Sequence, residues 1–341
     1  MEMIDLPEPE PGPGEVVLRV GLCGICGSDL HLYDSPMAGG DIVMGHEFGA
    51  TVAALGPGVE GWSEGDRVVT TMLEPCGNCV FCLRQEPELC YQHYRLELAR
   101  ARSGEGDDPA PSLGSGGYAP YTRTSAARLV RVPDALDERQ AACVEPAAVG
   151  FHAVHRSGMG LGDRVAVIGA GPIGLFTLQC AREAGASRVV VAELSGVRAR
   201  VAKDVGADAV FNPGDAGDVA AAFAEHLGGP PDVVFDAAGV PATLQQAVDI
   251  VRPRGSVMMV GVAFDAAPIR PASWVTKNVR VRAAFAYSRQ DYRSTMDLMA
   301  RGRIRVEPLV TSVVRGEETP AAFERLLGPN DEIKVLVDPH A

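Results

Sequence analysis

Hydrophobic and polar residues follow two different patterns along the chain. Up to about residue 146, short runs rich in β-branched residues, such as EVVLRV, FGATVAAL, DRVVTT and LVRV, alternate with Gly, Pro and Asp. Strand-sized runs separated by turn residues predict a compact, barrel-like β domain with few helices.

Beyond that point the pattern changes. Apolar runs such as VAVIG, RVVVAE, DVVFDAAG and SVMMVGV alternate with alanine-rich amphipathic segments such as PIGLFTLQCAREAG. This alternation predicts βαβ units and a parallel sheet that is covered by helices on both faces. It ends near residue 285, and the remaining segment, with two helix candidates and a closing strand EIKVLVD, could belong to either domain.

The composition is that of an ordinary globular protein. A length of 341 residues is enough for two domains. Hydrophobic residues at 46%, charged residues at 22% and a mean hydropathy of +0.05 exclude a disordered or fibrous chain. The formal net charge of −13 repels polyanions, so nucleic acid is not expected as a partner.

The sequence also bears on location. No apolar run reaches the roughly 18 residues that a bilayer-spanning helix needs. The N-terminal MEMIDLPEPEPGPGE is acidic and proline-rich, whereas a signal peptide is basic and then apolar. We therefore expect a cytoplasmic protein that does not bind membranes.

One segment shows no regular spacing of apolar residues. Residues 96–117, LELARARSGEGDDPAPSLGSGG, are rich in Gly, Pro, Ser and charge. This composition favours a surface loop over a segment that contacts substrate.

Cysteine placement indicates metal binding. Eight cysteines are too few for a disulfide scaffold, yet six of them lie between Cys23 and Cys90. The string CGNCVFCLRQEPELC has short gaps that let a chain wrap around a tetrahedral ion. Four thiolates leave no exchangeable position, which favours a structural zinc site over disulfides or free thiols. The predicted ligands are Cys76, Cys79, Cys82 and Cys90.

A second set of candidate ligands mixes residue types and is spread along the chain. It comprises Cys26 in LCGICGSDLH, His46 and Glu47 in MGHEFG, and Glu145 in CVEPAAVGFH. Separated ligands of mixed chemistry that leave a position for water are typical of a catalytic zinc. Each residue alone is more commonly part of a core, so this interpretation needs support from other motifs.

A dinucleotide-binding motif supplies that support. In VAVIGAGPIG an apolar strand runs into a glycine-rich turn that opens an amphipathic helix, whose N-terminus can hold the cofactor phosphates. The next strand ends in Glu193, nineteen residues beyond Gly174, where an acid can bind both ribose hydroxyls. The acid repels a 2′-phosphate, so NAD is favoured, with Arg198 keeping NADP open as the alternative. The expected cofactor-binding residues are Gly169, Gly171, Pro172, Ile173, Gly174, Glu193 and Arg198.

Together these motifs resemble those of the zinc-dependent medium-chain dehydrogenases, the superfamily of alcohol and polyol dehydrogenases. The match spans nearly the whole chain, from LCGICGSDLH, GHE and GDRV through the four-cysteine string to EPAAVGFHAV, GAGPIG and the closing IKVLV. Glu145 followed by Pro146 resembles the sorbitol, butanediol and threonine dehydrogenase branch, whereas liver-type alcohol dehydrogenases have a cysteine there.

The resemblance implies an α/β architecture with two domains. We expect a GroES-like β-barrel catalytic domain from residues 1–146 and 286–341, and a Rossmann NAD-binding domain with a doubly wound parallel sheet from residues 147–285. The resemblance further implies two zinc ions per chain and a homodimer or homotetramer that associates through the edge of the Rossmann sheet. It also places a strand before the proline-rich segment, so the β domain is expected to lack an edge strand or to start upstream of Met1.

The implied reaction is the reversible oxidation of a secondary alcohol to a ketone, with hydride transfer to NAD. Polyols, cyclitols, aminocyclitols, diols and hydroxy amino acids are the substrate classes. Zinc on Cys26, His46 and Glu145 would be the Lewis acid, with Glu145 bound directly or through water. Glu47 would approach the metal as an alternate ligand or as a partner of its ligands.

Two further residues have roles that the resemblance implies. Ser28 and His31 stand two and five residues after Cys26 and would carry the alcohol proton away from the site. One departure concerns the substrate, since sorbitol dehydrogenases tend to have an arginine where this chain has Ala286. Alanine cannot donate to a polyol, which disfavours sorbitol itself.

Two other functions are compatible with part of the pattern. The first is a zinc-free reductase of quinone or enone double bonds on the same scaffold, which the retention of Cys26, His46 and Glu145 disfavours. The second is a non-catalytic redox sensor that binds NADH, which the presence of Ser28 and His31 disfavours.

Overall fold

The computed structural model describes residues 1–34, 43–84, 86–90 and 116–341. The chain divides into two compact units, the first formed by residues 1–145, 288–300 and 310–341 and the second by residues 146–287 and 301–309. Of the predicted loop 96–117, only Gly116 and Gly117 lie within the described residues.

The second unit takes in a short segment that the family resemblance assigned to the β domain. Residues 301–309 join it because Arg305 and Gln179 exchange two hydrogen bonds. The amide Nε2 of Gln179 donates to the Arg305 carbonyl at 3.1 Å, and the Arg305 backbone N–H donates to Gln179 Oε1 at 2.7 Å. This contact spans 126 positions, so no local pattern could reveal it.

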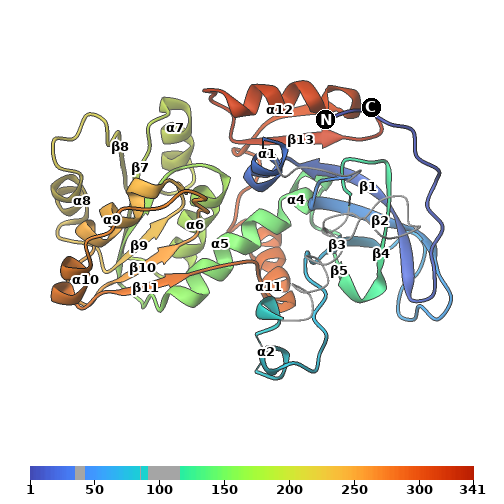
Figure 1. Ribbon diagram of the computed structural model, residues 1–341, viewed down its shortest axis with the longest axis horizontal. Helices are drawn as coiled ribbons and strands as arrows, with labels where there is room; N and C mark the ends of the chain where they lie inside the picture. The colour runs from blue at the N-terminus through green and yellow to red at the C-terminus, as the bar shows by residue number, and fades with distance from the viewer. Residues whose placement is uncertain (35–42, 85, 91–115) are drawn as a thin grey trace. The chain divides into compact units, whose positions relative to one another are not determined.

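A largely antiparallel sheet forms the first unit (Figure 1). Among the described residues it has seven strands in the order β12-β13-β1-β2-β3-β5, with β4 paired to β1. The four runs read as strands in the sequence form β1, β2, β3 and β5, which confirms the predicted β domain. The strands are β1 (Glu15–Gly24), β2 (Glu47–Leu55), β3 (Arg67–Thr70), β4 (Tyr121–Ser125), β5 (Leu129–Arg131), β12 (Val310–Arg315) and β13 (Lys334–Asp338).

Short helices accompany this sheet. Two of them matter for the site, because α1 follows β1 directly and α12 packs against α1 in one hydrophobic cluster around Phe323. Among the described residues, the α-helices of the first unit are α1 (Gly27–Tyr33), α2 (Val80–Leu83), α4 (Glu138–Ala142), α11 (Arg289–Ala300) and α12 (Thr319–Leu327). Within the described ranges, this unit also has single turns of 3-10 helix at η1 (Pro87–Leu89), η2 (Ala126–Arg128) and η3 (Gly316–Glu318).

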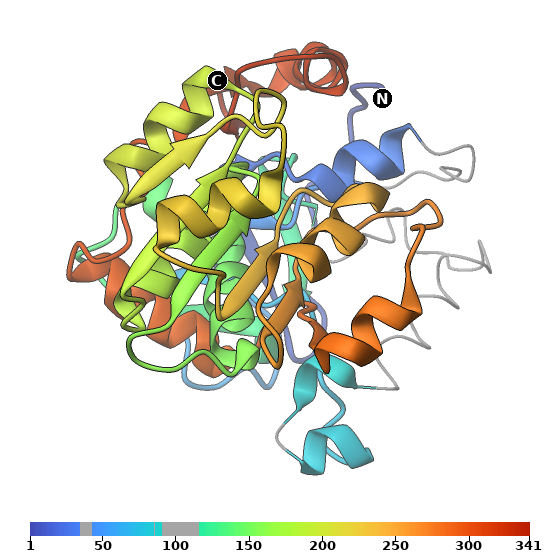
Figure 2. The same ribbon diagram turned by 90° about the vertical axis from the view of Figure 1, so that its left-hand side faces the viewer.

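The second unit contains a six-stranded sheet in the order β11-β10-β9-β6-β7-β8, with parallel neighbours throughout (Figure 1 and Figure 2). Counted from its first strand the order is 3-2-1-4-5-6, the doubly wound arrangement of dinucleotide-binding sheets. The predicted Rossmann sheet is thereby confirmed. Its strands are β6 (Arg164–Ile168), β7 (Arg188–Ala192), β8 (Ala209–Phe211), β9 (Val233–Asp236), β10 (Ser256–Met259) and β11 (Arg280–Ala283).

Helices connect these strands as the βαβ pattern predicts. The connecting helices are α6 (Pro172–Glu183), α7 (Gly196–Asp204), α8 (Val219–Leu227), α9 (Pro241–Ile250) and α10 (Pro271–Lys277). Helix α5 (Val144–Ser157) begins in the first unit and leads into β6. In the part of the chain that the structure describes, no helix is long and apolar enough to cross a bilayer.

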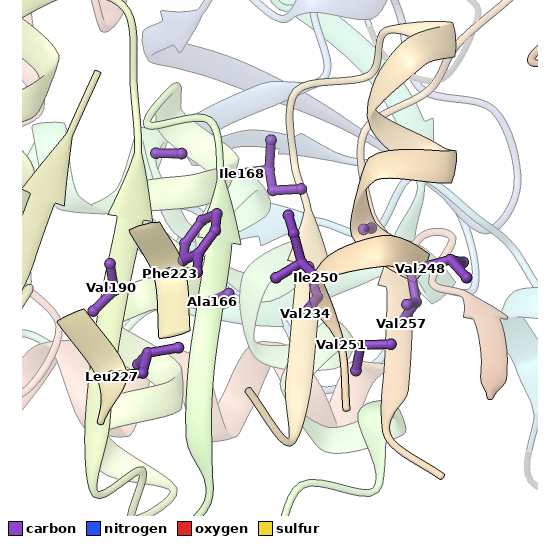
Figure 3. Close-up of a cluster of buried hydrophobic side chains, with 12 residues drawn as sticks. Ala166, Ile168, Val190, Phe223, Leu227, Val234, Val248, Ile250, Val251 and Val257 are labelled. Atoms are coloured by element: carbon purple, nitrogen blue, oxygen red, sulfur yellow. The ribbon is translucent and has the colours of Figure 1, made fainter. Parts of the chain in front are cut away.

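The core of the second unit fixes the strands that carry the glycine-rich turn. Phe223 and Leu227 of α8 and Ile250 of α9 pack against β6, β7, β9 and β10 (Figure 3). Burying a large apolar side chain contributes about 1.5–3 kcal/mol, so this layer holds the carboxyl ends of the strands in place. The contributing strand residues include Ala166, Ile168, Val190, Val234 and Val257.

Candidate active site and metal centres

Four sulfur atoms converge beside α2. Cys79 Sγ lies 3.6 Å from Cys82 Sγ and 4.0 Å from Cys90 Sγ, and Cys76 Sγ lies 4.0 Å from Cys82 Sγ. A disulfide would need about 2.05 Å. Sulfurs at the corners of a tetrahedron with Zn–S bonds of about 2.3 Å would be about 3.8 Å apart. The spacing therefore fits a tetrahedral ion and does not fit disulfides.

The surroundings of these thiols also fit a cation. The Cys76 backbone N–H donates to Cys90 Sγ at 3.3 Å, a contact that stabilises a thiolate. Burial and the neighbouring thiols raise the pKa of Cys82 to about 12. A divalent ion would reverse this effect, because it stabilises the deprotonated sulfur that ligates it.

A second group brings together three of the predicted ligands. The ligand atoms of Cys26, His46 and Glu47 all lie within 4.8 Å of one another. Cys26 is the N-cap of α1, His46 directly precedes β2, and Glu47 is its first residue. The Glu145 carboxylate is buried in the first turn of α5, and among the described residues it does not belong to this group.

Asp29, which the sequence analysis missed, orients His46. Asp29 Oδ1 lies 3.5 Å from His46 Nδ1, and the Cys26 backbone N–H donates to Asp29 Oδ2 at 3.2 Å. Burial alone would raise the pKa of Asp29, but hydrogen bonds from His46, Tyr118 and the Cys26 amide outweigh it and hold the pKa below its usual value. An ionised carboxylate at Nδ1 leaves Nε2 of the imidazole for a metal.

A buried lysine, Lys334, faces Glu47. The sequence pattern did not indicate it either. Lys334 Nζ donates to Glu47 Oε2 at 2.5 Å and to the Ile25 carbonyl at 2.9 Å. Burial would lower the pKa of Lys334, but the Glu47 carboxylate and the Cys26 thiol outweigh it and raise that pKa. The lysine therefore stays charged and neutralises Glu47.

A glycine between the two strands leaves room for this ion pair. Gly24 lies on β1, between β13, which carries Lys334, and β2, which carries Glu47. A Cβ atom on Gly24 would lie 2.3 Å from Glu47 Oε2 and 3.3 Å from Lys334 Cδ. The two side chains can meet only because the residue between them has none.

The two predicted proton carriers lie on α1. Ser28 Oγ donates to Cys26 Sγ at 3.2 Å, so its hydroxyl is beside the candidate ligand. His31 is exposed in the last turn of the same helix. The helix thus carries one residue at the ligand group and one in contact with solvent.

The glycine-rich turn has room for a ligand at one position. A Cβ on Gly174 would lie 2.0 Å from the Gly169 carbonyl oxygen, so Gly174 is required by the close packing of turn and helix. Gly169 has a φ of +92°, which disfavours other residues. A Cβ on Gly171, the N-cap of α6, would meet no atom within 4 Å, so the backbone there is open to a phosphate. Pro172 and Ile173 follow as the first two residues of α6.

Glu193 follows β7 and is buried against the turn. Its Oε2 accepts the Ala170 backbone N–H at 2.6 Å, and its Oε1 accepts the Ser195 backbone N–H at 2.7 Å. Each oxygen retains a second lone pair for a ribose hydroxyl. Arg198 lies in the first turn of α7, and its backbone N–H donates to Oγ of Ser195, the N-cap of that helix, at 3.3 Å.

Comparison with known families agrees with both halves of the chain. Residues 12–134 match the alcohol dehydrogenase GroES-like domain, and residues 172–301 match the zinc-binding dehydrogenase domain. The GroES-like and Rossmann architecture predicted from the motifs is therefore confirmed.

Curated relatives include diol and polyol dehydrogenases. The chain is 34% identical over 347 aligned positions to (R,R)-butanediol dehydrogenase of Bacillus subtilis, covering 98% of this chain and 95% of that protein. It is 33% identical to sorbitol dehydrogenase of Gallus gallus, covering 98% of this chain and 92% of the relative.

Solved structures with the same fold align with 98–99% of the chain. The 2R,3R-butanediol dehydrogenase from Bacillus subtilis superposes with a TM-score of 0.84 at 32% identity, covering 99% of this chain and 96% of that one. An alcohol dehydrogenase from E. coli CFT073 in complex with NADH has a TM-score of 0.87 at 26% identity, with 99% and 95% coverage. A zinc-binding dehydrogenase from Sinorhizobium meliloti bound to NADP has a TM-score of 0.83 at 31% identity, with 98% and 94% coverage.

Proposed function

The chain belongs to the zinc-dependent medium-chain dehydrogenases, and from this premise we propose that it oxidises a secondary alcohol reversibly to a ketone, with NAD as hydride acceptor. The observation that carries the proposal is the convergence of the Cys26, His46 and Glu47 ligand atoms within 4.8 Å. Thiolate, imidazole and carboxylate together suit zinc, and the mixed set is typical of a catalytic site.

We propose two zinc ions per chain. Cys76, Cys79, Cys82 and Cys90 would hold the structural ion, in line with their tetrahedral sulfur spacing. Cys26 and His46 would hold the catalytic ion. The third ligand would be Glu145, bound directly or through water, as the resemblance to the family implies. Glu47, whose carboxylate lies within the ligand group and pairs with Lys334, would be the alternate ligand. When bound, zinc supplies a Lewis acid for the substrate oxygen, and nicotinamide supplies the hydride acceptor.

Two residues of this chain, Ser28 and His31, would take part in transfer of the proton that the substrate hydroxyl loses. Ser28, whose hydroxyl contacts Cys26, would accept the proton that the substrate hydroxyl loses. His31 is exposed three residues later and would release a proton to solvent. Oxidation removes one hydride and one proton from the alcohol. NAD would accept the hydride, and Ser28 and His31 would stand at the two ends of the proton's route, at the ligand group and at the solvent.

We propose NAD over NADP because of Glu193. Its buried carboxylate sits at the glycine-rich turn, where it would accept ribose hydroxyls and repel a 2′-phosphate. Glu193→Ala should therefore reduce the ratio of kcat/KM with NAD to kcat/KM with NADP by about tenfold or more, the effect of roughly 1.4 kcal/mol. Steady-state kinetics with both cofactors measure this ratio. An unchanged ratio would show that Glu193 does not set the preference.

The substrate classes we propose are diols, polyols, cyclitols, aminocyclitols and hydroxy amino acids with a secondary hydroxyl. Ala286 has no donor, so a substrate that depends on a side-chain hydrogen bond at this position is disfavoured. The test is to follow NADH absorbance with the purified enzyme across these classes. Turnover of at least one secondary alcohol is expected, and NADH binding without any turnover would favour the redox sensor.

Association of two or more chains is part of the proposal. Strand β11 is an edge of the six-stranded sheet, with exposed residues along it, and Phe264 and Val275 are 70% and 78% exposed. The edge of a sheet offers backbone donors and acceptors to a second copy, and exposed apolar side chains in the same unit favour association. Light scattering should give the mass of a dimer or tetramer, and the mass of one chain would contradict the idea.

A further inference from the structure

Tyr118 lies next to the chain segment that carries His46. The Gly117 backbone N–H donates to the Gly45 carbonyl at 2.8 Å, and the Tyr118 backbone N–H donates to the Met44 carbonyl at 3.0 Å. Residues 116–118 therefore run beside the two residues that precede the candidate ligand.

The segment with Gly117 and Tyr118 packs so closely against the segment before His46 that a larger side chain would not fit between them. A Cβ on Gly117 would lie 2.6 Å from the Phe48 ring and 2.7 Å from Cys23 Sγ. Gly45, with a φ of +99°, would place a Cβ 2.9 Å from the same sulfur. Since the glycines on both segments are needed for the close approach, the backbone of Tyr118 is held at a defined position relative to His46.

The Tyr118 side chain reaches the residue that orients His46. Tyr118 Oη donates to Asp29 Oδ2 at 2.6 Å and lies 3.2 Å from the Gly24 carbonyl. Burial, and then the Asp29 charge, raise the pKa of Tyr118 well above its ordinary value, so the phenol stays protonated and acts as a donor. The Asp29 carboxylate thus has one oxygen held by Tyr118 and the Cys26 amide, and its other oxygen faces His46 Nδ1.

We propose that Tyr118 is a positioning residue for the catalytic zinc, acting on the ligand His46 through Asp29. The proposal rests on the proposed zinc site. A carboxylate that faces Nδ1 at 3.5 Å depends on being held in plane, because rotation about its Cβ–Cγ bond would carry Oδ1 away from the ring. Tyr118 and the Cys26 amide both hold Oδ2, and the amide contact is the longer of the two at 3.2 Å.

A second tyrosine offers a matched control. Tyr118 and Tyr33 both pack edge-on against Phe323, with ring centroids 5.7 Å and 5.6 Å away. Tyr33 Oη also donates to a carboxylate, that of Glu324. Tyr33→Phe therefore removes the same chemical group from the same aromatic cluster without touching the Asp29–His46 pair.

The experiment compares metal release from the two variants. The catalytic site is loaded with Co2+ while the four-cysteine site keeps zinc, and the visible absorption of Co2+ is followed after addition of a chelator. Tyr118→Phe should shift the Co2+ absorption bands and raise the rate of Co2+ release by about three- to tenfold. This is at or below the roughly 10- to 100-fold loss of metal affinity seen when a residue that supports a metal ligand is replaced. Tyr33→Phe should leave both the bands and the rate as in the wild type.

A double-mutant cycle separates action through Asp29 from a general effect on folding. Asp29→Asn can still accept the Cys26 amide but has lost the charge that Tyr118 supports. Adding Tyr118→Phe to Asp29→Asn should then change the release rate by less than twofold, because residues in one hydrogen-bonded network are not additive.

Each outcome has a distinct meaning. Equal or slower release from Tyr118→Phe, or full additivity with Asp29→Asn, would overturn the role of Tyr118 and leave the zinc site standing. A wild-type enzyme that binds metal at the four cysteines alone would refute the catalytic site itself, and this role with it.

Discussion

Replacing Cys26 by serine should lower kcat/KM for alcohol oxidation by at least about a thousand-fold while NADH still binds. Cys26 belongs to the ligand group with His46 and Glu47, and a serine hydroxyl is a much poorer zinc ligand than a thiolate. Losing a Lewis acid removes several kcal/mol of transition-state stabilisation, and each 1.36 kcal/mol is tenfold in rate. Steady-state kinetics measure the loss, and fluorescence titration measures NADH binding.

NADH binding should persist because the glycine-rich turn and Glu193 belong to the other compact unit. Cys180→Ala is the matched control, since this buried thiol on α6 lies in the second unit and outside both candidate metal groups. It should retain turnover within a few-fold. Equal loss of turnover and of NADH binding in Cys26→Ser would contradict the division of roles between the two units.

The second large effect is on stability. Lys334→Met should destabilise the protein by about 3–5 kcal/mol, because it leaves the Glu47 charge buried without its partner. The side chains of Lys334 and Glu47 are 2% and 1% exposed, so water cannot replace the lost ion pair. Thermal unfolding followed by circular dichroism should show a midpoint lower by roughly 10 °C.

A second variant tests the cause of this loss. Glu47→Gln combined with Lys334→Met removes both charges and should recover most of the stability, because a neutral pair carries no large desolvation cost. If the double variant is as unstable as Lys334→Met alone, the loss comes from packing and not from the unpaired carboxylate.

The features that could be predicted from the sequence are those whose residues lie close together along the chain. Most strands of the two sheets followed from the period of apolar residues, although β4 and β12 did not. The four-cysteine group followed from spacings of three and eight positions in one string. The Gly169 turn was likewise recognisable because its strand, glycines and helix are contiguous.

The residues that support the ligands could not be found in this way. Lys334 is 287 positions from Glu47, and Tyr118 is 89 positions from Asp29. Their partners are determined by strand order and by close approach at Gly24 and Gly117, which no local pattern records. Asp29 carried a weak signal, since it stands three residues after Cys26 in the same motif.

The proposed chemistry depends on a zinc ion bound by Cys26 and His46. Anomalous X-ray scattering at the zinc absorption edge, from crystals of the enzyme as purified, detects such an ion without relying on turnover. We predict two peaks per chain, one among the four cysteines and one at bonding distance from Cys26 Sγ and His46 Nε2, about 2.3 Å and 2.0–2.1 Å. The second peak would also show whether Glu145, Glu47 or water completes the site. A single peak at the four cysteines would refute the catalytic zinc and favour a zinc-free reductase.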